Sequence, residues 1–119
     1  IDQWRTEHDS YLKTWEDRFV VEQGYLRIMA DAVGGLLGKA GVEPKSVSKA
    51  VLSGPDARSH AALAKKLGFD VKTQLQDPLF GQVGNSGAAM ALLLLVAALE
   101  TARAGDRMVV ASYGDGADA

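Results

Sequence analysis

The sequence contains no cysteine among its 119 residues. This absence excludes a disulfide, a zinc–thiolate site and a cysteine nucleophile supplied by this chain. A cysteine-free chain is compatible with the cytosol, and we expect a cytoplasmic protein. An excess of positive charge is also lacking, because 13 basic and 15 acidic residues leave a net charge of −2. The basic surface typical of nucleic-acid binding is therefore not indicated.

A hydrophobic run long enough for a membrane is lacking too. The most apolar run covers residues 87–102, GAAMALLLLVAALETA, and is shorter than the roughly 20 residues that a bilayer span needs. The chain opens IDQWRTEHDSY, without the basic and apolar regions of a leader peptide. With 47% hydrophobic and 24% charged residues, the composition is that of a globular protein. We expect one domain over residues 1–119 and no membrane partner.

Helical and strand patterns alternate along the chain. We expect helices over residues 25–40, 57–68 and 87–104, and strands over residues 49–53, 69–75 and 108–113. Gly41 ends the first helix, and Asp56 and Ser86 are candidate N-caps of the other two. The helix over residues 87–104 is apolar on nearly all sides, so it is expected to be the most buried element. The order predicts a layered α/β fold with a mainly parallel sheet and a buried central helix.

The first 24 residues are polar and irregular but carry regularly spaced aromatic residues. Trp4, Tyr11, Trp15 and Phe19 are separated by seven, four and four positions. This spacing favours a short amphipathic helix with an aromatic stripe. The stripe either packs on the core of the larger parent protein or faces a ligand.

Two features predict that the chain is part of something larger. The expected sheet has only three strands, and the last one runs into the end of the chain. A helix as apolar as the one over residues 87–104 also needs cover on every side.

The segment from Val83 to Ala89 is the strongest candidate for a functional site. Asn85 lies between glycines just before the apolar helix, where backbone N–H groups and the helix dipole favour negative charge. An amide there suits a developing enolate or thioester oxyanion. The alternative is an asparagine turn that only caps the helix.

Residues 84–119, GNSGAAMALLLLVAALETARAGDRMVVASYGDGADA, resemble the C-terminal region of thiolase-superfamily condensing enzymes. The similarity is to 3-hydroxy-3-methylglutaryl-CoA synthases and ketoacyl-ACP synthase III, which carry Gly-Asn-[Thr/Ser] before a long apolar helix. In these families a Gly-Asp turn and a strand ending in a glycine loop follow, as Gly105-Asp106 and the strand before Gly114 do here. The resemblance extends upstream to about residue 14 and implies a thiolase-like half-domain.

The resemblance implies roles for particular residues. Asn85 falls on the asparagine that helps to hold the thioester carbonyl of the acyl-CoA as the enolate forms. The loop from Gly114 to Gly116 falls where backbone lines the pocket beside an acylated cysteine. Gly84, Ser86 and Tyr113 are expected to contact substrate with them.

One position departs from the family pattern. A histidine is the family's second oxyanion partner, and Ser53 occupies that position here. Serine can donate one hydrogen bond but is no acid or base near pH 7. His60, about two helical turns further on, is a weaker substitute, and His8 in the polar N-terminal segment is weaker still.

The implied reaction is carbon–carbon bond formation on a cysteine thioester, with a CoA thioester as substrate and no bound cofactor or metal. The family's cysteine and glutamate base belong to its N-terminal half, so the chain is expected to be inactive alone. The expected partners are acyl-CoA and an N-terminal thiolase half or partner subunit, in a dimer. Two alternatives stay open: a non-catalytic scaffold subunit of a thiolase-like complex, and a retro-aldol CoA-thioester lyase subunit.

Overall fold

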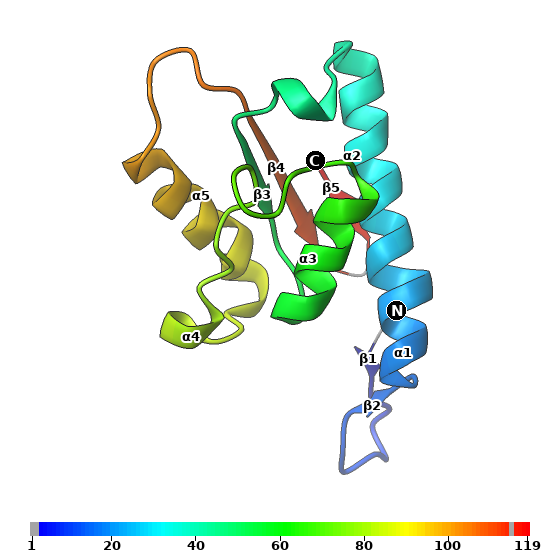
Figure 1. Cartoon of the computed structure of the whole chain (residues 1–119). Helices are drawn as coiled ribbons and strands as arrows, with labels where there is room; N and C mark the ends of the chain where they lie inside the picture. Colours follow the sequence, from blue (N-terminus) through cyan, green and yellow to red (C-terminus); the bar gives the residue numbers. More distant parts are fainter. Residues whose placement is uncertain (1–2, 115) are drawn as a thin grey trace.

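The computed structural model describes residues 3–114 and 116–119, and its centre is a small mixed sheet (Figure 1). Strands β3 (Lys49–Leu52) and β4 (Met108–Tyr113) are parallel, and β5 (Ala117–Asp118) pairs antiparallel with the end of β4. Both long strands lie where their apolar runs predicted them, although β3 ends one residue early. The short hairpin made by β4 and β5 makes the sheet mixed.

Helices cover both faces of this sheet (Figure 1). On one face lie α2 (Leu26–Ala40) and α3 (Ala57–Lys66), and on the other lies α5 (Met90–Glu100). The side chains of β3 alternate accordingly: Ala50 and Leu52 are buried against α2 and α3, whereas Val51 is buried against α5. The predicted layered α/β architecture is confirmed.

Helix α2 follows a π-helix and ends at a left-handed glycine. A single turn, α1 (Asp17–Phe19), leads into a π-helix over Val20–Tyr25, which continues into α2. Gly41 ends α2 in the left-handed conformation, with φ of 62°, which glycine adopts without steric cost. The predicted stop at Gly41 is therefore confirmed.

Two further caps and turns lie between the main elements. Asp56 caps α3, because its Oδ1 accepts from the Ser59 N–H at 2.9 Å, as predicted. A short 3₁₀ turn (Pro44–Ser46) precedes β3, and a single helical turn, α4 (Phe80–Val83), precedes the candidate site.

The prediction of a strand over residues 69–75 is wrong. Asp70 folds the segment into a turn, because its Oδ1 accepts from the N–H groups of Lys72 at 2.7 Å and Thr73 at 2.9 Å. Only Leu75 keeps a parallel bridge, to Ala50. The sheet thus gains one bridging residue here instead of a strand.

The prediction of an aromatic helix near the N-terminus is also wrong for most of that segment. Residues 3–14 form a hairpin in which β1 (Gln3–Trp4) pairs antiparallel with β2 (Lys13–Thr14). The ring of Trp15 contacts those of Trp4 and Phe19, with centroids 5.2 and 6.0 Å apart and the planes tilted by 49° and 52°. Trp15 and Phe19 are more than half exposed, so the stripe does not pack on the core of this chain. Ile1 and Asp2 lie outside the described residues.

The helix predicted over residues 87–104 is shorter and less buried than expected. A 3₁₀ turn (Gly87–Ala89) precedes α5, and the chain leaves α5 after Glu100 for a turn held by Asp106, which accepts from the Arg103 N–H at 2.8 Å. One face of α5 is buried against β3 and β4, but Leu92 and Val96 are 66% and 58% exposed. Because the sheet covers only one side, α5 is not the most buried element. Among the described residues no helix is long and apolar enough to cross a bilayer.

Candidate functional site

Three loops meet at the carboxyl ends of the two parallel strands. The loop after β3 begins at Ser53, the loop after β4 begins at Gly114, and the loop before α5 contains Asn85. Ser53 Oγ accepts a hydrogen bond from the Tyr113 N–H at 2.9 Å. Asn85 Nδ2 donates to the Pro55 carbonyl oxygen at 3.3 Å. Loops that are far apart in sequence are thus joined at the sheet edge where open α/β folds bind ligands.

Asn85 both caps the helix start and reaches across to the next loop. Its Oδ1 accepts from the Gly87 N–H at 2.9 Å, while its Nδ2 is directed to Pro55. A carboxamide carries two N–H hydrogens, and the bond to Pro55 uses one of them. Asn85 as a whole is exposed at the surface of this chain.

The prediction that Ser86 caps the helix is wrong. Its side chain makes no capping hydrogen bond, and its Oγ is buried without a hydrogen-bond partner in the structure. Asn85 takes over the capping role because its side chain can reach the N–H two residues ahead, as in an Asx turn. Gly84, with φ of 66°, provides the tight turn before it.

Ser53 joins the ends of the two parallel strands. Its backbone N–H donates to the Ala111 carbonyl at 3.0 Å, and its Oγ accepts from Tyr113. The residue is only 5% exposed. The hydroxyl oxygen therefore has a structural partner already.

Two cavities open beside these loops. The first, of about 770 Å³, lies between Pro55, Asp56, Tyr113 and Gly114 on one side and the N-terminal segment on the other. The second cavity, of about 560 Å³, is lined by the following residues: Gly87, Ala88, Ser112, Tyr113, Gly114, Gly116, Ala117 and Asp118.

The predicted site residues divide between these cavities and their surroundings. Tyr113 and Gly114 line both cavities, and Gly116 lines the second. Asp115, which the predicted loop includes, lies outside the described residues. Four predicted site residues line neither cavity: Ser53, Gly84, Asn85 and Ser86. The predicted pocket bordered by Ser53 and Asn85 is therefore not formed by this chain alone.

Two ionisable side chains near the site, Asp56 and His60, have shifted pKa values. The pKa of Asp56 lies below its usual value. Partial burial acts to raise this pKa, but the hydrogen bonds from Ser59 and Arg58 lower it by more. His60 is 1% exposed, and this burial lowers the pKa of its imidazole. It lines neither cavity, while His8 lies exposed on the hairpin beside Glu7. No group of three or more metal-ligating side chains occurs within residues 3–114 and 116–119.

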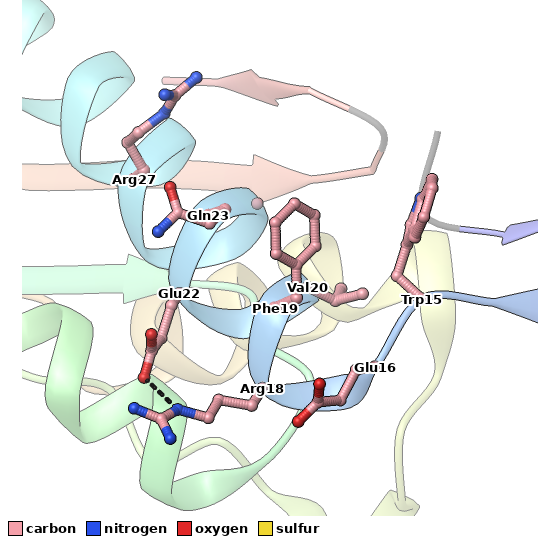
Figure 2. Close-up of a pocket in the computed structure, with 9 residues that line it drawn as sticks. Trp15, Glu16, Arg18, Phe19, Val20, Glu22, Gln23 and Arg27 are labelled. Carbon is pink, nitrogen blue, oxygen red and sulfur yellow. Dashed lines mark hydrogen bonds and ion pairs between the residues drawn. The ribbon is translucent and has the colours of Figure 1, made fainter.

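A third cavity, of about 710 Å³, is lined by residues of the segment from Trp15 to Arg27 (Figure 2). None of its lining residues belongs to the converging loops. Trp15, Phe19 and Arg27 line this cavity, and Arg18 Nε, which also belongs to its lining, pairs with Glu22 Oε1 one helical turn away at 3.0 Å. Its apolar walls come from the exposed aromatic stripe. Trp15 and Phe19 thus face a surface hollow and not the core of this chain.

A mixed β-sheet between two helical layers, with the candidate loops at the carboxyl ends of its parallel strands, defines a thiolase-like α/β half-domain. The structure of 3-oxoacyl-(acyl carrier protein) synthase III from Pseudomonas aeruginosa has this fold, with a TM-score of 0.81 and 23% identity over 98% of this chain and 37% of that one. The enzyme of the same name from Aquifex aeolicus superposes with a TM-score of 0.74. The chain belongs to the family described as 3-oxoacyl-[acyl-carrier-protein (ACP)] synthase III C terminal, which residues 37–119 match.

Curated relatives are similar over nearly the whole chain. A hydroxymethylglutaryl-CoA synthase from Aeropyrum pernix is 38% identical over 98% of this chain, and one from Methanococcus maripaludis is 34% identical over 98%. The chain spans about a third of the length of these relatives, 32% and 33% respectively. The resemblance to a thiolase-like C-terminal half is therefore confirmed.

Proposed function

We propose that this chain contributes one half of the active site of an acyl-CoA condensing enzyme similar to hydroxymethylglutaryl-CoA synthase. The reaction joins carbon atoms while one acyl group is held on a cysteine that this chain does not supply. The observation that carries this function is the convergence of the Asn85, Ser53 and Gly114 loops beside a cavity of about 770 Å³. A cavity of this size suits a small-molecule ligand.

Asn85 is assigned the role of oxyanion donor. Its free amide N–H, together with the backbone at the start of α5, would stabilise negative charge on a thioester oxygen as the enolate forms. Ser53 replaces the family's histidine and holds the ends of β3 and β4 together. The exposed backbone of Gly114 and Gly116, with Tyr113, would line the acyl site, and Gly84 and Ser86 would shape the Asn85 turn.

The missing part of the site is expected on the uncovered face of α5. Leu92, Val96 and Leu99 are each more than half exposed on this face. An apolar surface of this kind marks an interface. We assign it to the N-terminal half or partner subunit that brings the cysteine.

The expected assembly is a cytoplasmic dimer. Sedimentation of the complete protein measures the number of subunits directly.

The reaction itself is tested in the complete protein. Incubation with acetyl-CoA and an acyl-CoA acceptor, followed by mass spectrometry, should reveal an acylated cysteine peptide, a condensed product and free CoA. The chain of residues 1–119 alone should form no stable acetyl adduct, because it has no cysteine. A stoichiometric adduct on that chain, or a complete protein without acylation or condensation, would refute the assignment.

A scaffold function is the second candidate. Ser53 cannot act as an acid or base near pH 7, and one N–H of the Asn85 amide already donates to the Pro55 carbonyl oxygen. A complete protein with no cysteine at the acyl site would favour the scaffold. A retro-aldol lyase would use the same groups in reverse, and assays in both directions separate it from a synthase.

A further inference from the structure

Tyr25 places a buried hydroxyl beneath the loop that follows β3. Its side chain is fully buried, and its Oη donates to the Ser53 carbonyl oxygen at 2.9 Å. Its ring meets Tyr113 edge-on, with centroids 5.4 Å apart at 84°. Burial, with a smaller contribution from the Asp56 charge, raises the pKa of Tyr25, so the hydroxyl stays protonated and keeps donating.

The loop approaches this hydroxyl closely because Gly54 has no side chain. A Cβ atom at Gly54 would lie 2.7 Å from Tyr25 Oη and 3.2 Å from its Cζ. Tyr25 is also the last residue of the π-helix over Val20–Tyr25. Such helices are rare and frequently accompany functional sites. Gly54, Tyr25 and the π-helix together fix the path of the loop that follows β3.

The same loop carries the contact of Asn85. Two residues beyond the carbonyl that Tyr25 holds, the Pro55 carbonyl accepts from Asn85 Nδ2 at 3.3 Å. We propose that Tyr25 is a positioning residue whose hydroxyl fixes the loop from Ser53 to Pro55 and, through it, the Asn85 amide. This inference rests on the proposed role of Asn85 as oxyanion donor. Because Tyr25 is fully buried, it acts without touching substrate.

The kinetics of the complete protein test this coupling. Tyr25→Phe keeps the ring but removes the hydroxyl, and we expect kcat to fall about tenfold with KM little changed, because displacing a group by an ångström can cost up to ~100-fold in rate. In an Asn85→Ala background, Tyr25→Phe should cause no further loss, because two residues that act through one contact are not additive. Val33→Ala is the matched control, since Val33 is also fully buried and lies in α2, which continues directly from the π-helix that ends at Tyr25. It should lower the melting temperature and leave kcat unchanged.

Gly54→Ala gives an independent readout. The new Cβ meets the phenol oxygen first, so the fold-loss in kcat should be smaller when Tyr25→Phe is also present. Wild-type kcat in Tyr25→Phe, or an equal fold-loss with and without Asn85→Ala, would overturn the positioning role.

If Asn85→Ala alone keeps full activity, the proposed function of Asn85 fails. A crystal structure of the Tyr25→Phe protein then decides the positioning role separately. An Asn85–Pro55 distance beyond 3.5 Å supports it, and an unchanged loop refutes it.

Discussion

The uncovered face of α5 leads to a prediction about stability in the complete protein. Leu92 is 66% exposed, whereas Leu94, two residues further along the same helix, is fully buried against the sheet. The two leucines have the same chemistry and differ only in what covers them in this chain. Leu92→Ala and Leu94→Ala therefore form a matched pair.

The expected magnitudes separate the two possibilities. Burying a whole leucine side chain contributes roughly 1.5–3 kcal/mol, and only about a third of Leu92 is buried here. If nothing else covers α5, Leu92→Ala should cost no more than about 1 kcal/mol. If another part of the complete protein packs on this face, the substitution should cost about 2–5 kcal/mol, as in a packed core.

Urea denaturation of the complete protein measures both free energies of unfolding. We expect Leu92→Ala to destabilise it by about 2–5 kcal/mol, close to the value for Leu94→Ala. A loss below about 1 kcal/mol for Leu92→Ala, with the full loss for Leu94→Ala, would show that α5 faces solvent. The reasoning that assigns this face to a missing half of the site would then be wrong.

Two further predictions concern ionisable groups near the site. Asp56→Ala removes the cap of α3 and should lower stability in a thermal melt by about 0.5–2 kcal/mol; an unchanged melt would contradict the cap. Because the pKa of Asp56 is lowered, its contribution is present above about pH 4 and lost as the pH falls further. The folded pKa of His60 is also lowered, so the unfolded chain takes up the proton first, and stability should decrease as the pH falls below about 6.5. His60→Leu should remove this part of the pH dependence; equal slopes in both proteins would contradict it.

Local signals predicted much of the fold correctly. The apolar run at β4 has no alternation because both faces of the strand are covered, one by α2 and one by α5. Gly41 and Asp56 lie where a helix stop and an N-cap were expected, because both depend on residues within one turn. Features determined within a few residues are visible in a single sequence.

The predictions that were wrong concern segments in which two different sets of interactions compete. The side chain of Asp70 hydrogen-bonds its own backbone and prevents a strand that the weak alternation favoured. The apolar pattern of α5 indicates that all sides prefer burial, but not which side this chain can cover. Trp4 and Trp15 meet because the β1–β2 hairpin brings them together, although their spacing fits a helical stripe equally well.

The candidate site was predictable only in part. The glycine-flanked Asn85 and the turn at Gly114 stand out by motif, and the parallel strands explain why their loops meet. Tyr25 and Pro55 were missed, because a tyrosine on an apolar helix face looks like an ordinary core residue. Its hydroxyl partner lies 28 positions away in sequence. The one available signal was that a polar atom in that stripe needs a partner.

The kinetics of Asn85 variants in the complete protein test the central claim most directly. Asn85→Asp keeps an oxygen that can accept from the Gly87 N–H but loses the amide donor, whereas Asn85→Ala loses both. If Asn85 is the oxyanion donor, kcat for CoA-thioester condensation should fall by about 100-fold or more in both variants. Full activity in Asn85→Asp would show that the residue only caps its helix and would contradict the account.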